Sequence, residues 1–382
     1  MRTRSVVLPF VLAAALACGQ KPTDKNKDKK DPLLIKPPTN NTQPVSTPTK
    51  PDTKPVTPAT TMAASTPTSA RSLLIDLPTK ETYLAMGTEV DQAKTFTYNF
   101  EKEQKASYQL SLEWRLKGEK LEALGNFYGK FTTDLTWVIK DVDAKGEAQI
   151  EITYGRIQAE YNGILGKGGE KFDSKAKDQT PGTLLAPFGK MDGKTFSMKI
   201  SKEGKISSLT GQDKILEEAL SDPAFPAALK LQIIAGMGEK GLQQLLGQGF
   251  LAFPTEEMKK GYTFGLIEAP LTIPALGQVN IQETVTLEGL REIDGKQQGL
   301  FSLAILTVLD NTKGGPSLIE LPPFTFAVNM TESPYAEGFF MFDLKRGLPA
   351  LVALPILFNL ELSSPMKDTI NGEVTLVVKL VE

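Results

Sequence analysis

Tyr108-Gln109-Leu110-Ser111-Leu112-Glu113-Trp114-Arg115-Leu116 is the clearest structural signal in this chain of 382 residues. Large apolar side chains stand at every second position, and polar side chains stand between them. Successive side chains of an extended strand point to opposite faces, so this pattern predicts one buried and one solvent-facing side. Strands of that kind are typical of antiparallel sheets that pack on a core with one face.

The same alternation recurs along the chain and marks hairpins. Residues 131–139 alternate, turn at Asp143-Ala144-Lys145-Gly146 and return through residues 148–154. A second hairpin, with its turn at Lys202-Glu203-Gly204-Lys205, joins residues 196–200 to Ile206. We therefore expect a mainly β (α+β) fold of antiparallel sheets, with further strands at residues 279–287, 300–309, 324–330 and 374–380.

The middle of the chain changes from a strand period to a helical one. Residues 215–220, 227–235 and 242–246 are apolar at helical spacing, with interruptions at Pro223, Pro226 and Gly236. We expect a helical segment at residues 212–252, between two β regions.

The two β regions share local patterns. Leu135-Thr136-Trp137-Val138 before its Gly-containing turn resembles Val285-Thr286-Leu287-Glu288 before Asp294-Gly295-Lys296. Phe196-Ser197-Met198 followed by Gly204 resembles Phe339-Phe340-Met341 followed by Gly347. We predict two similar β lobes, 72–211 and 253–382, that arose by duplication. The alternative is that any two antiparallel meanders share alternation and Asp-Gly turns.

The first residues have the layout of a secretory signal. Arg2 and Arg4 precede an apolar run at 6–16, which ends in Ala15-Leu16-Ala17-Cys18. A cysteine at this point makes the segment resemble a bacterial lipoprotein signal. The resemblance implies that residues 1–17 are removed and that Cys18 carries lipid such as palmitate. Gly19 after the cysteine resembles lipoproteins sorted to the outer membrane, if the organism has one.

Residues 18–71 are expected to be a disordered tether. The stretch is rich in Pro, Thr and Lys and has no apolar periodicity, so it cannot bury enough surface to offset its ordering entropy. It carries five more basic than acidic residues, which favours an anionic bilayer, whereas the body from Ser72 carries nine more acidic than basic residues. An acidic body argues against nucleic acid as a partner.

The chain has no histidine, and Cys18 is its one cysteine. If Cys18 is lipidated, no thiol remains for a disulfide, a metal site or a nucleophile. The missing histidine removes Ser-His-Asp arrangements and His-based zinc sites. Carboxylate pairs and Ser-Lys pairs are the chemistries left, and we assign no catalytic, metal-binding or cofactor-binding residue.

Three motifs fit catalytic or cofactor patterns only in their letters. Gly236-Met237-Gly238-Glu239-Lys240-Gly241 matches a dinucleotide-binding loop, but helix rather than strand is expected before it. Ser174-Lys175-Ala176-Lys177 has the spacing of the Ser-x-x-Lys motif in Ser-Lys acyl enzymes, and Lys313-Gly314-Gly315 faintly resembles the third motif of those enzymes. The Ser174 stretch, however, is polar and turn-rich. Glu217-Glu218 and Glu256-Glu257 are sequence neighbours, which do not face each other on a helix.

Two stretches are unusually apolar: the helical middle and the late residues 339–342 with 348–360. One interpretation is that helices pack on the concave face of a sheet and fill its core. The other is an apolar groove between sheet and helices that accepts a lipid or another lipophilic ligand.

Three consecutive stretches resemble a family of uncharacterised bacterial lipoproteins. They are Gly249-Phe250-Leu251-Ala252-Phe253-Pro254, Lys260-Gly261-Tyr262-Thr263-Phe264 and the hairpin at 279–305. The resemblance implies the β architecture and supplies no catalytic residue.

These observations predict a lipid-anchored cell-envelope protein that acts as a non-enzymatic binding or structural module. Its expected partners are the membrane, through Cys18, and either a lipophilic ligand or an envelope protein. The alternative is an envelope hydrolase that uses carboxylates or a Ser-Lys pair. The two differ in whether acidic, Ser or Lys groups converge in one cleft.

Overall fold

The computed structural model describes most of the body of the chain. The described residues are 80–120, 127–162, 169–177, 185–223, 225, 227–273, 277–309, 317–321, 324–331, 333–364 and 367–381. The predicted signal at 1–17, Cys18 and the predicted tether lie outside them.

The first half of the body is mostly strand. Its elements are α2 (Lys80–Ala85), β1 (Thr88–Val90), β2 (Lys105–Lys117), β3 (Phe127–Val142), β4 (Ala148–Tyr161), β5 (Glu170–Asp173), α4 (Ala186–Gly189), β6 (Thr195–Ile200) and β7 (Ile206–Thr210).

Three helices follow, and then strands resume. The helices are α5 (Gln212–Ala219), α6 (Ala227–Met237) and α7 (Glu239–Gly249). The later strands are β8 (Thr263–Ile273), β9 (Gly277–Ile293), β10 (Lys296–Leu309), β11 (Ser317–Leu321), β12 (Phe324–Thr331), β13 (Ala336–Asp343), β14 (Leu348–Ser364) and β15 (Asp368–Val381). The mainly β, antiparallel prediction is confirmed.

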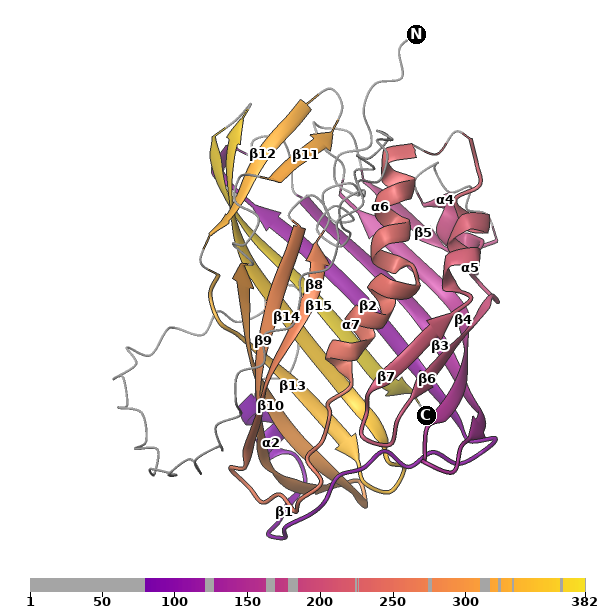
Figure 1. Cartoon of the computed structure of the whole chain (residues 1–382), viewed down its shortest axis with the longest axis vertical. Coiled ribbons are helices and arrows are strands. Elements are labelled where there is room, and N and C mark those ends of the chain that lie inside the picture. The colour runs from indigo at the N-terminus through magenta and orange to yellow at the C-terminus, as the bar shows by residue number, and fades with distance from the viewer. Residues whose placement is uncertain are drawn as a thin grey trace, which may run out of the picture. The chain divides into compact units, whose positions relative to one another are not determined.

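The described strands form one 15-stranded sheet, in which neighbouring strands are antiparallel (Figure 1). Its main path runs β1-β9-β10-β13-β14-β15-β2-β3-β4-β6-β7, and β8 pairs with β9. Strands from the two predicted lobes therefore join directly, since β15 pairs with β2 and β1 pairs with β9. The two-lobe arrangement is not confirmed, because one continuous sheet contains both halves.

The order of strands is nevertheless the same in both halves. The series β2-β3-β4-β6-β7 and the series β8-β9-β10-β13-β14 are each a five-strand antiparallel meander, and β15 lies between them. The two hairpin pairs that look alike in sequence, β3–β4 with β9–β10 and β6–β7 with β13–β14, occupy equivalent places in this order. Duplication stays a prediction, and this topology is what it would produce.

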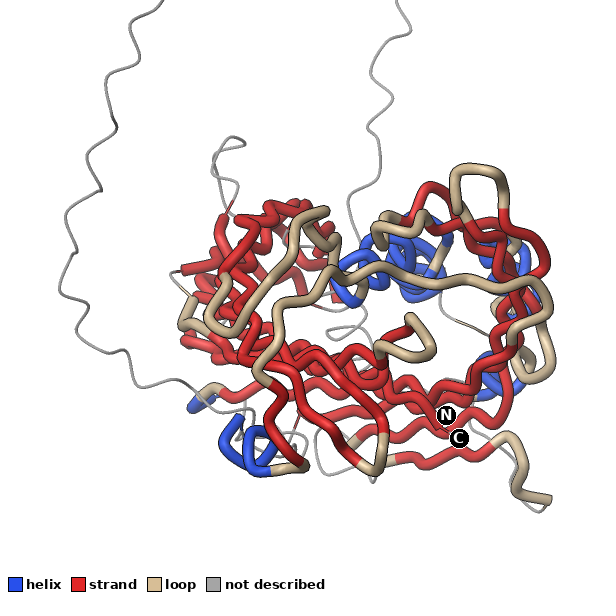
Figure 2. The backbone as a smooth tube through the Cα atoms, turned by 90° about the horizontal axis from the view of Figure 1, so that it is seen from below, coloured by secondary structure: helices blue, strands red, loops and turns tan. Residues whose placement is uncertain are grey.

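Helices cover the inner face of the sheet, which we define as the face that carries Tyr108, Leu110, Trp114 and Leu116 of β2. Buried side chains of α5, α6 and α7 belong to the same core as these residues. Figures 1 and 2 show the sheet curving around these helices. Helix α7 packs against β7 and β8, which lie at opposite ends of the strand order, and against β14. Buried side chains of the three helices therefore pack on the concave side of the sheet.

An aromatic cluster fills one end of this core. The extended residues 94–100 cross the hairpin turns: the Tyr98 amide donates to the Lys202 carbonyl (2.9 Å), and the Asn99 amide donates to the Gly347 carbonyl (3.1 Å). The Phe96 ring lies 5.0 Å from that of Phe301, centroid to centroid. The other rings in contact with these are Tyr98, Phe100, Trp137, Phe250, Phe253, Phe264, Phe340 and Phe342.

A smaller apolar cluster lies on the opposite, outer face and is covered by α2. The Tyr83 ring of α2 packs 5.4 Å from the Phe339 ring of β13. The buried members of this cluster are Tyr83, Leu300, Phe339, Met341, Leu351, Ala353 and Val377. Strands β13 to β15 are therefore buried on both faces, which accounts for the continuous apolar run at 348–360.

Two glycines test how tightly the inner face packs. Gly372 of β15 lies opposite Phe358 of β14, and a Cβ atom at this position would overlap the Phe358 ring. We expect Gly372→Ala to lower the free energy of unfolding by about 1–3 kcal/mol, because the ring must leave its packed position. The measurement is denaturant unfolding.

Gly247→Ala is the matched control. A Cβ at Gly247, in α7, would meet nothing within 4 Å. The control should gain about 0.5–1 kcal/mol, because alanine favours helix over glycine. Equal effects of the two substitutions would contradict the packing described for Phe358.

Candidate binding site

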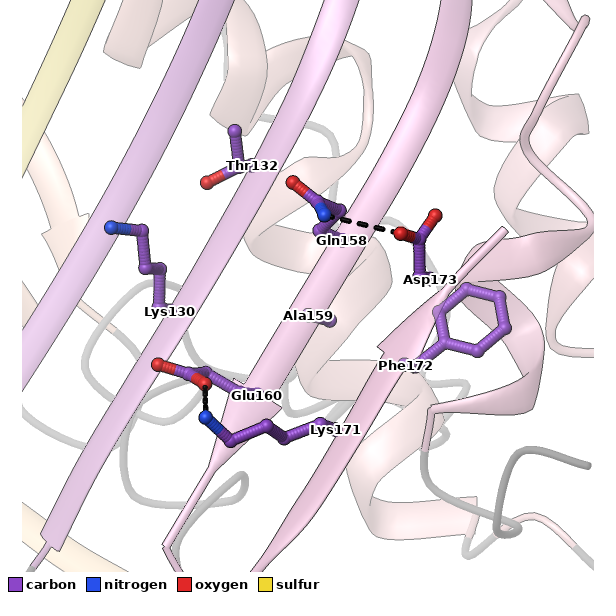
Figure 3. A pocket seen from close by; sticks show the side chains of 8 residues that line it. All are labelled: Lys130, Thr132, Gln158, Ala159, Glu160, Lys171, Phe172 and Asp173. Atoms are coloured by element: carbon purple, nitrogen blue, oxygen red, sulfur yellow. Dashed lines mark hydrogen bonds and ion pairs between the residues drawn. The ribbon is translucent and has the colours of Figure 1, made fainter. Parts of the chain in front are cut away.

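Two adjoining hollows lie on the outer face of the sheet. The larger has a volume of about 860 Å³ and extends from α2 and β10 to β3. The smaller, of about 400 Å³, lies over β3, β4 and β5 (Figure 3). Lys130 lines both. Both hollows lie on the face opposite α5, α6 and α7, and so not where the predicted groove between sheet and helices would be.

Strand register brings the lining residues together in rows. One row is Met341, Leu351, Lys379 and Gln109, and the next outer-face row contains Val377, Ser111 and Thr132. A third row runs Thr375, Glu113, Lys130, Glu160 and Lys171. The rows come from strands β13 to β5, so residues 109 and 379 become neighbours only through sheet formation.

The floor of the larger hollow is apolar in its middle. Met341, Leu351 and Val377 belong to the outer-face cluster, and Ala350 packs against that cluster. Tyr83 and Met86 form the wall on the α2 side, where Met86 remains 41% exposed. Burial raises the pKa of the Tyr83 hydroxyl to about 12, so the hydroxyl stays neutral. An apolar ligand segment can therefore lie on this floor.

Charged groups line the ends and rim of the larger hollow. Glu113 is 1% exposed and forms an ion pair with Lys130 through Oε1, while its Oε2 is buried and has no hydrogen-bond partner among the described residues. At the other end, Gln298 Oε1 is buried and likewise unpartnered within the described residues. A buried acceptor left without a donor costs about 1–3 kcal/mol, which a ligand donor would recover.

Lys379 is the cation best placed for a ligand anion. It is exposed, it lines the larger hollow beside Gln109, and its ammonium group makes no hydrogen bond or ion pair with another described residue. Asp343, by contrast, has a structural role, since its Oδ1 accepts the backbone amides of Lys345 (2.9 Å) and Arg346 (3.0 Å) in the β13–β14 turn.

The smaller hollow is bordered by satisfied ion pairs. Lys171 of β5 pairs with Glu160 of β4 at 2.7 Å, and Gln158 donates to Asp173 at 3.2 Å (Figure 3). Arg156 also donates a hydrogen bond to Asp173. This hydrogen bond is the main reason that the pKa of the Asp173 carboxyl lies well below its usual range. Because these charged and polar groups already bind one another, the smaller hollow offers fewer side-chain donors and acceptors to a ligand than the larger one.

The structure does not bring Ser174 and Lys177 into hydrogen-bonding contact. The Ser174 hydroxyl donates to Asp192 Oδ2 at 2.5 Å and accepts the Ile157 amide at 3.0 Å. Asp192 also pairs with Lys175 at 2.8 Å, whereas Lys177 is exposed. The serine therefore ties a loop to β4 rather than facing a neutral lysine base. Lys313-Gly314-Gly315 lies outside the described residues.

The structure also gives no carboxylate dyad at the two adjacent glutamate pairs, Glu217-Glu218 and Glu256-Glu257, because the members make different contacts. Glu218 pairs with Lys194 at 2.6 Å, and this contact lowers the pKa of the Glu218 carboxyl. Glu256 accepts a hydrogen bond from the Tyr262 hydroxyl. Glu217 and Glu257 are exposed. In the described part of the chain, no group of three or more His, Cys, Asp or Glu side chains is arranged to hold a metal ion.

Gly236 to Gly241 lies at the junction of two helices. Helix α6 ends at Met237 and α7 begins at Glu239, with Gly238 as its N-cap. The Glu239 amide is capped by Asp213 Oδ1 at 2.7 Å. A dinucleotide loop follows a strand, and here a helix precedes the glycines.

None of the described helices is long and apolar enough to span a membrane.

Glu283 of β9 is a buried carboxyl that the sequence analysis missed. It lies between Ile281 and Val285 on the inner-facing side, opposite Ile305, and is 2% exposed. Desolvation raises its pKa to about 7. The signal was present in the sequence, because Glu283 interrupts an otherwise apolar alternation at 279, 281, 285 and 287.

Comparison with known proteins places part of this chain near one family. Residues 145–292, from the β3–β4 turn to β9, match the model of a family of unknown function (DUF6263). The match covers the hairpins and helices of the middle of the body and supplies no activity. No curated protein matches the chain.

Likenesses to solved structures are weak. The structure described as "Lipid-protein interactions in lipovitellin" is 12% identical over 74% of this chain, with a TM-score of 0.38. The match covers only 26% of the lipovitellin chain. The binding domain of botulinum neurotoxin serotype C1 is 10% identical over 72% of this chain and 79% of its own, with a TM-score of 0.10. Likenesses at this level assign neither fold nor function.

Glu283 predicts a pH-dependent stability. Its pKa is about 7 in the folded protein, against an ordinary value of 4.5, so the folded state binds the proton more tightly than the unfolded chain. The free energy of unfolding should therefore be highest below pH 4.5 as far as this group is concerned. It should fall by about 3 kcal/mol as the pH rises from 4.5 through 7, and change little above that as far as this group is concerned.

Glu283→Gln should remove this dependence, since glutamine does not ionise. Glu292→Gln, an exposed position on the same strand, is the control and should keep it. The measurement is chemical unfolding at a series of pH values. An unchanged slope in Glu283→Gln would mean that Glu283 is not the titrating group.

Proposed function

We propose that this chain is a lipid-anchored cell-envelope protein whose body is a non-enzymatic binding module. Its lipidated residue is Cys18, and Gly19 favours the outer membrane if the organism has one. The body binds an amphipathic molecule in the larger outer-face hollow. The observation that carries the proposal is the combination of an apolar floor with unpartnered polar groups around it.

The dimensions of the hollow support a ligand of moderate size. Its volume of about 860 Å³ lies within the range of small-molecule sites. It crosses six strands, from β10 to β3, which corresponds to about 24 Å at the usual strand spacing. An extended molecule fits such a trough better than a compact one.

The arrangement of polar groups supports binding over catalysis. A Ser-Lys enzyme requires a lysine within hydrogen-bonding reach of the serine, and Ser174 is instead held by Asp192. Glu113 and Glu160 pair with lysines, and Asp343 accepts backbone amides. These contacts fix side chains in place, which suits recognition of a ligand.

The anchor is tested by Cys18→Ala. The substitution removes the lipid attachment, so we expect the protein to move from the membrane fraction to the soluble fraction. Gly19→Ala is the control and should stay with the membranes. Immunoblotting of fractionated cells measures the distribution. Membrane retention of Cys18→Ala would refute the anchor.

The binding site is tested by Ser111→Trp. Ser111 lines the larger hollow near its β3 end, and its hydroxyl contacts the Thr132 hydroxyl (3.2 Å), so an indole there fills that end without disturbing the inner core. Native mass spectrometry of protein extracted from its own envelope should show a bound molecule that Ser111→Trp lacks.

Ser208→Trp is the matched control. Ser208 is a half-buried serine on β7, away from the hollow, and should leave the bound molecule in place. A wild-type protein that carries no ligand, or a ligand that survives Ser111→Trp, would contradict the proposed site.

A further inference from the structure

We propose that the ligand of the larger hollow is a zwitterionic phospholipid with a phosphoethanolamine-type headgroup. This inference rests on the proposed function and names the ligand class for the same site. It derives from the order in which cationic, anionic and apolar groups follow one another along the hollow.

The anionic part of the headgroup is placed by two lysines. Lys379 lies opposite Gln109, and Lys130 lies opposite Glu113, while Ser111 is midway between Gln109 and Glu113 on the same face of β2. Residues two apart on one face of a strand are separated by about 6.6 Å, which a lysine side chain spans. A phosphate over Ser111 therefore lies within reach of both lysine ammonium groups.

The cationic part is placed by Glu113. Its Oε1 is occupied by Lys130, and its Oε2 is buried without a partner among the described residues. A primary ammonium group beside the phosphate would donate to Oε2 and supply the missing hydrogen bond. A headgroup with only negative charge would leave that oxygen unsatisfied and would place an anion against a carboxylate.

The acyl chain is placed by the apolar floor. From Val377, which lies opposite Ser111, the floor continues through Leu351 and Met341 toward Tyr83 and Met86. Because this apolar path begins at the headgroup position, the occupant must carry a hydrocarbon chain. Free phosphoethanolamine would leave the path empty.

A second copy of the chain or a peptide fits these observations less well. A peptide contributes backbone donors and acceptors along its whole length, whereas the middle of the floor is formed by Met341, Leu351 and Val377, which have no polar group to offer. The polar contacts are gathered at the ends and along one rim.

The test uses the full chain with Cys18→Ala, so that the protein can be handled without detergent. Isothermal titration calorimetry compares lysophosphatidylethanolamine with lysophosphatidylglycerol of the same acyl chain, both below their micelle-forming concentrations. Free phosphoethanolamine is the third probe. We expect the zwitterionic amphiphile to bind about tenfold more tightly than the anionic one, and the free headgroup to bind least.

Two variants separate the headgroup contacts. Glu113→Gln should reduce the preference for the zwitterionic amphiphile to about threefold or less, because the carboxylate that attracts the ammonium is gone. Lys379→Gln should weaken both amphiphiles, since both carry the phosphate. Lys199→Gln, another exposed strand lysine, is the control and should change neither affinity.

The thermal midpoint of each variant is measured in parallel, so that a loss of binding through misfolding is recognised. If Glu113→Gln fails to fold, the preference of the wild type and the effect of Lys379→Gln still decide the inference. Equal binding of the two amphiphiles, or unchanged binding in Lys379→Gln, would overturn it while leaving the binding site intact. A peptide that co-purifies and is lost in Ser111→Trp would likewise overturn the phospholipid and retain the proposed function.

Discussion

The pairing of β2 with β15 is the contact on which the sheet depends. Its register runs from Ser107 opposite Val381 to Lys117 opposite Asn371, and it joins two five-strand meanders that would otherwise be separate. The partners lie more than 250 residues apart in the chain. Such long-range pairing carries a large loop-closure entropy, so we expect this sheet to close late in folding.

The same pairing shapes both faces of the sheet. On the inner side it places Leu376 and Val378 beside Leu112 and Leu110, in the core that α5, α6 and α7 cover. On the outer side it places Val377 and Lys379 beside Ser111 and Gln109 in the larger hollow. Because side chains alternate across a strand, one register decides the lining of both faces.

Aromatic side chains pack tightly at one end of the inner core. Phe96, Phe253 and Phe342 contact one another at 5.0–6.1 Å between ring centroids, and the strap at 94–100 is hydrogen-bonded to the hairpin turns. Among the described residues, the short α2 packs on the outer-face cluster through Tyr83, which contacts Phe339. Met341, Leu351 and Val377 of this cluster form the apolar floor of the larger hollow.

Some of the residues that matter could be read from the sequence, and others could not. Glu283 was detectable, since it breaks an apolar alternation within one strand. Glu113 and Lys130 were not, because each occupies an ordinary polar position of its strand and becomes special only when β2 and β3 pair. The polar, turn-rich surroundings of Ser174 already argued against a Ser-Lys pair, but only the fold shows that its hydroxyl donates to Asp192.

Local pattern alone predicted strands, hairpin turns and the helical middle that the structure contains, since each depends on residues close together in the chain. The lipoprotein-like signal rests on local pattern in the same way and stays a prediction. Tertiary structure alone decided that the two β regions form one sheet, that helices pack on its concave side, and that two hollows lie on its outer face. These features depend on which distant strands pair and in which register. That choice is made by the burial of whole faces, which no single segment encodes.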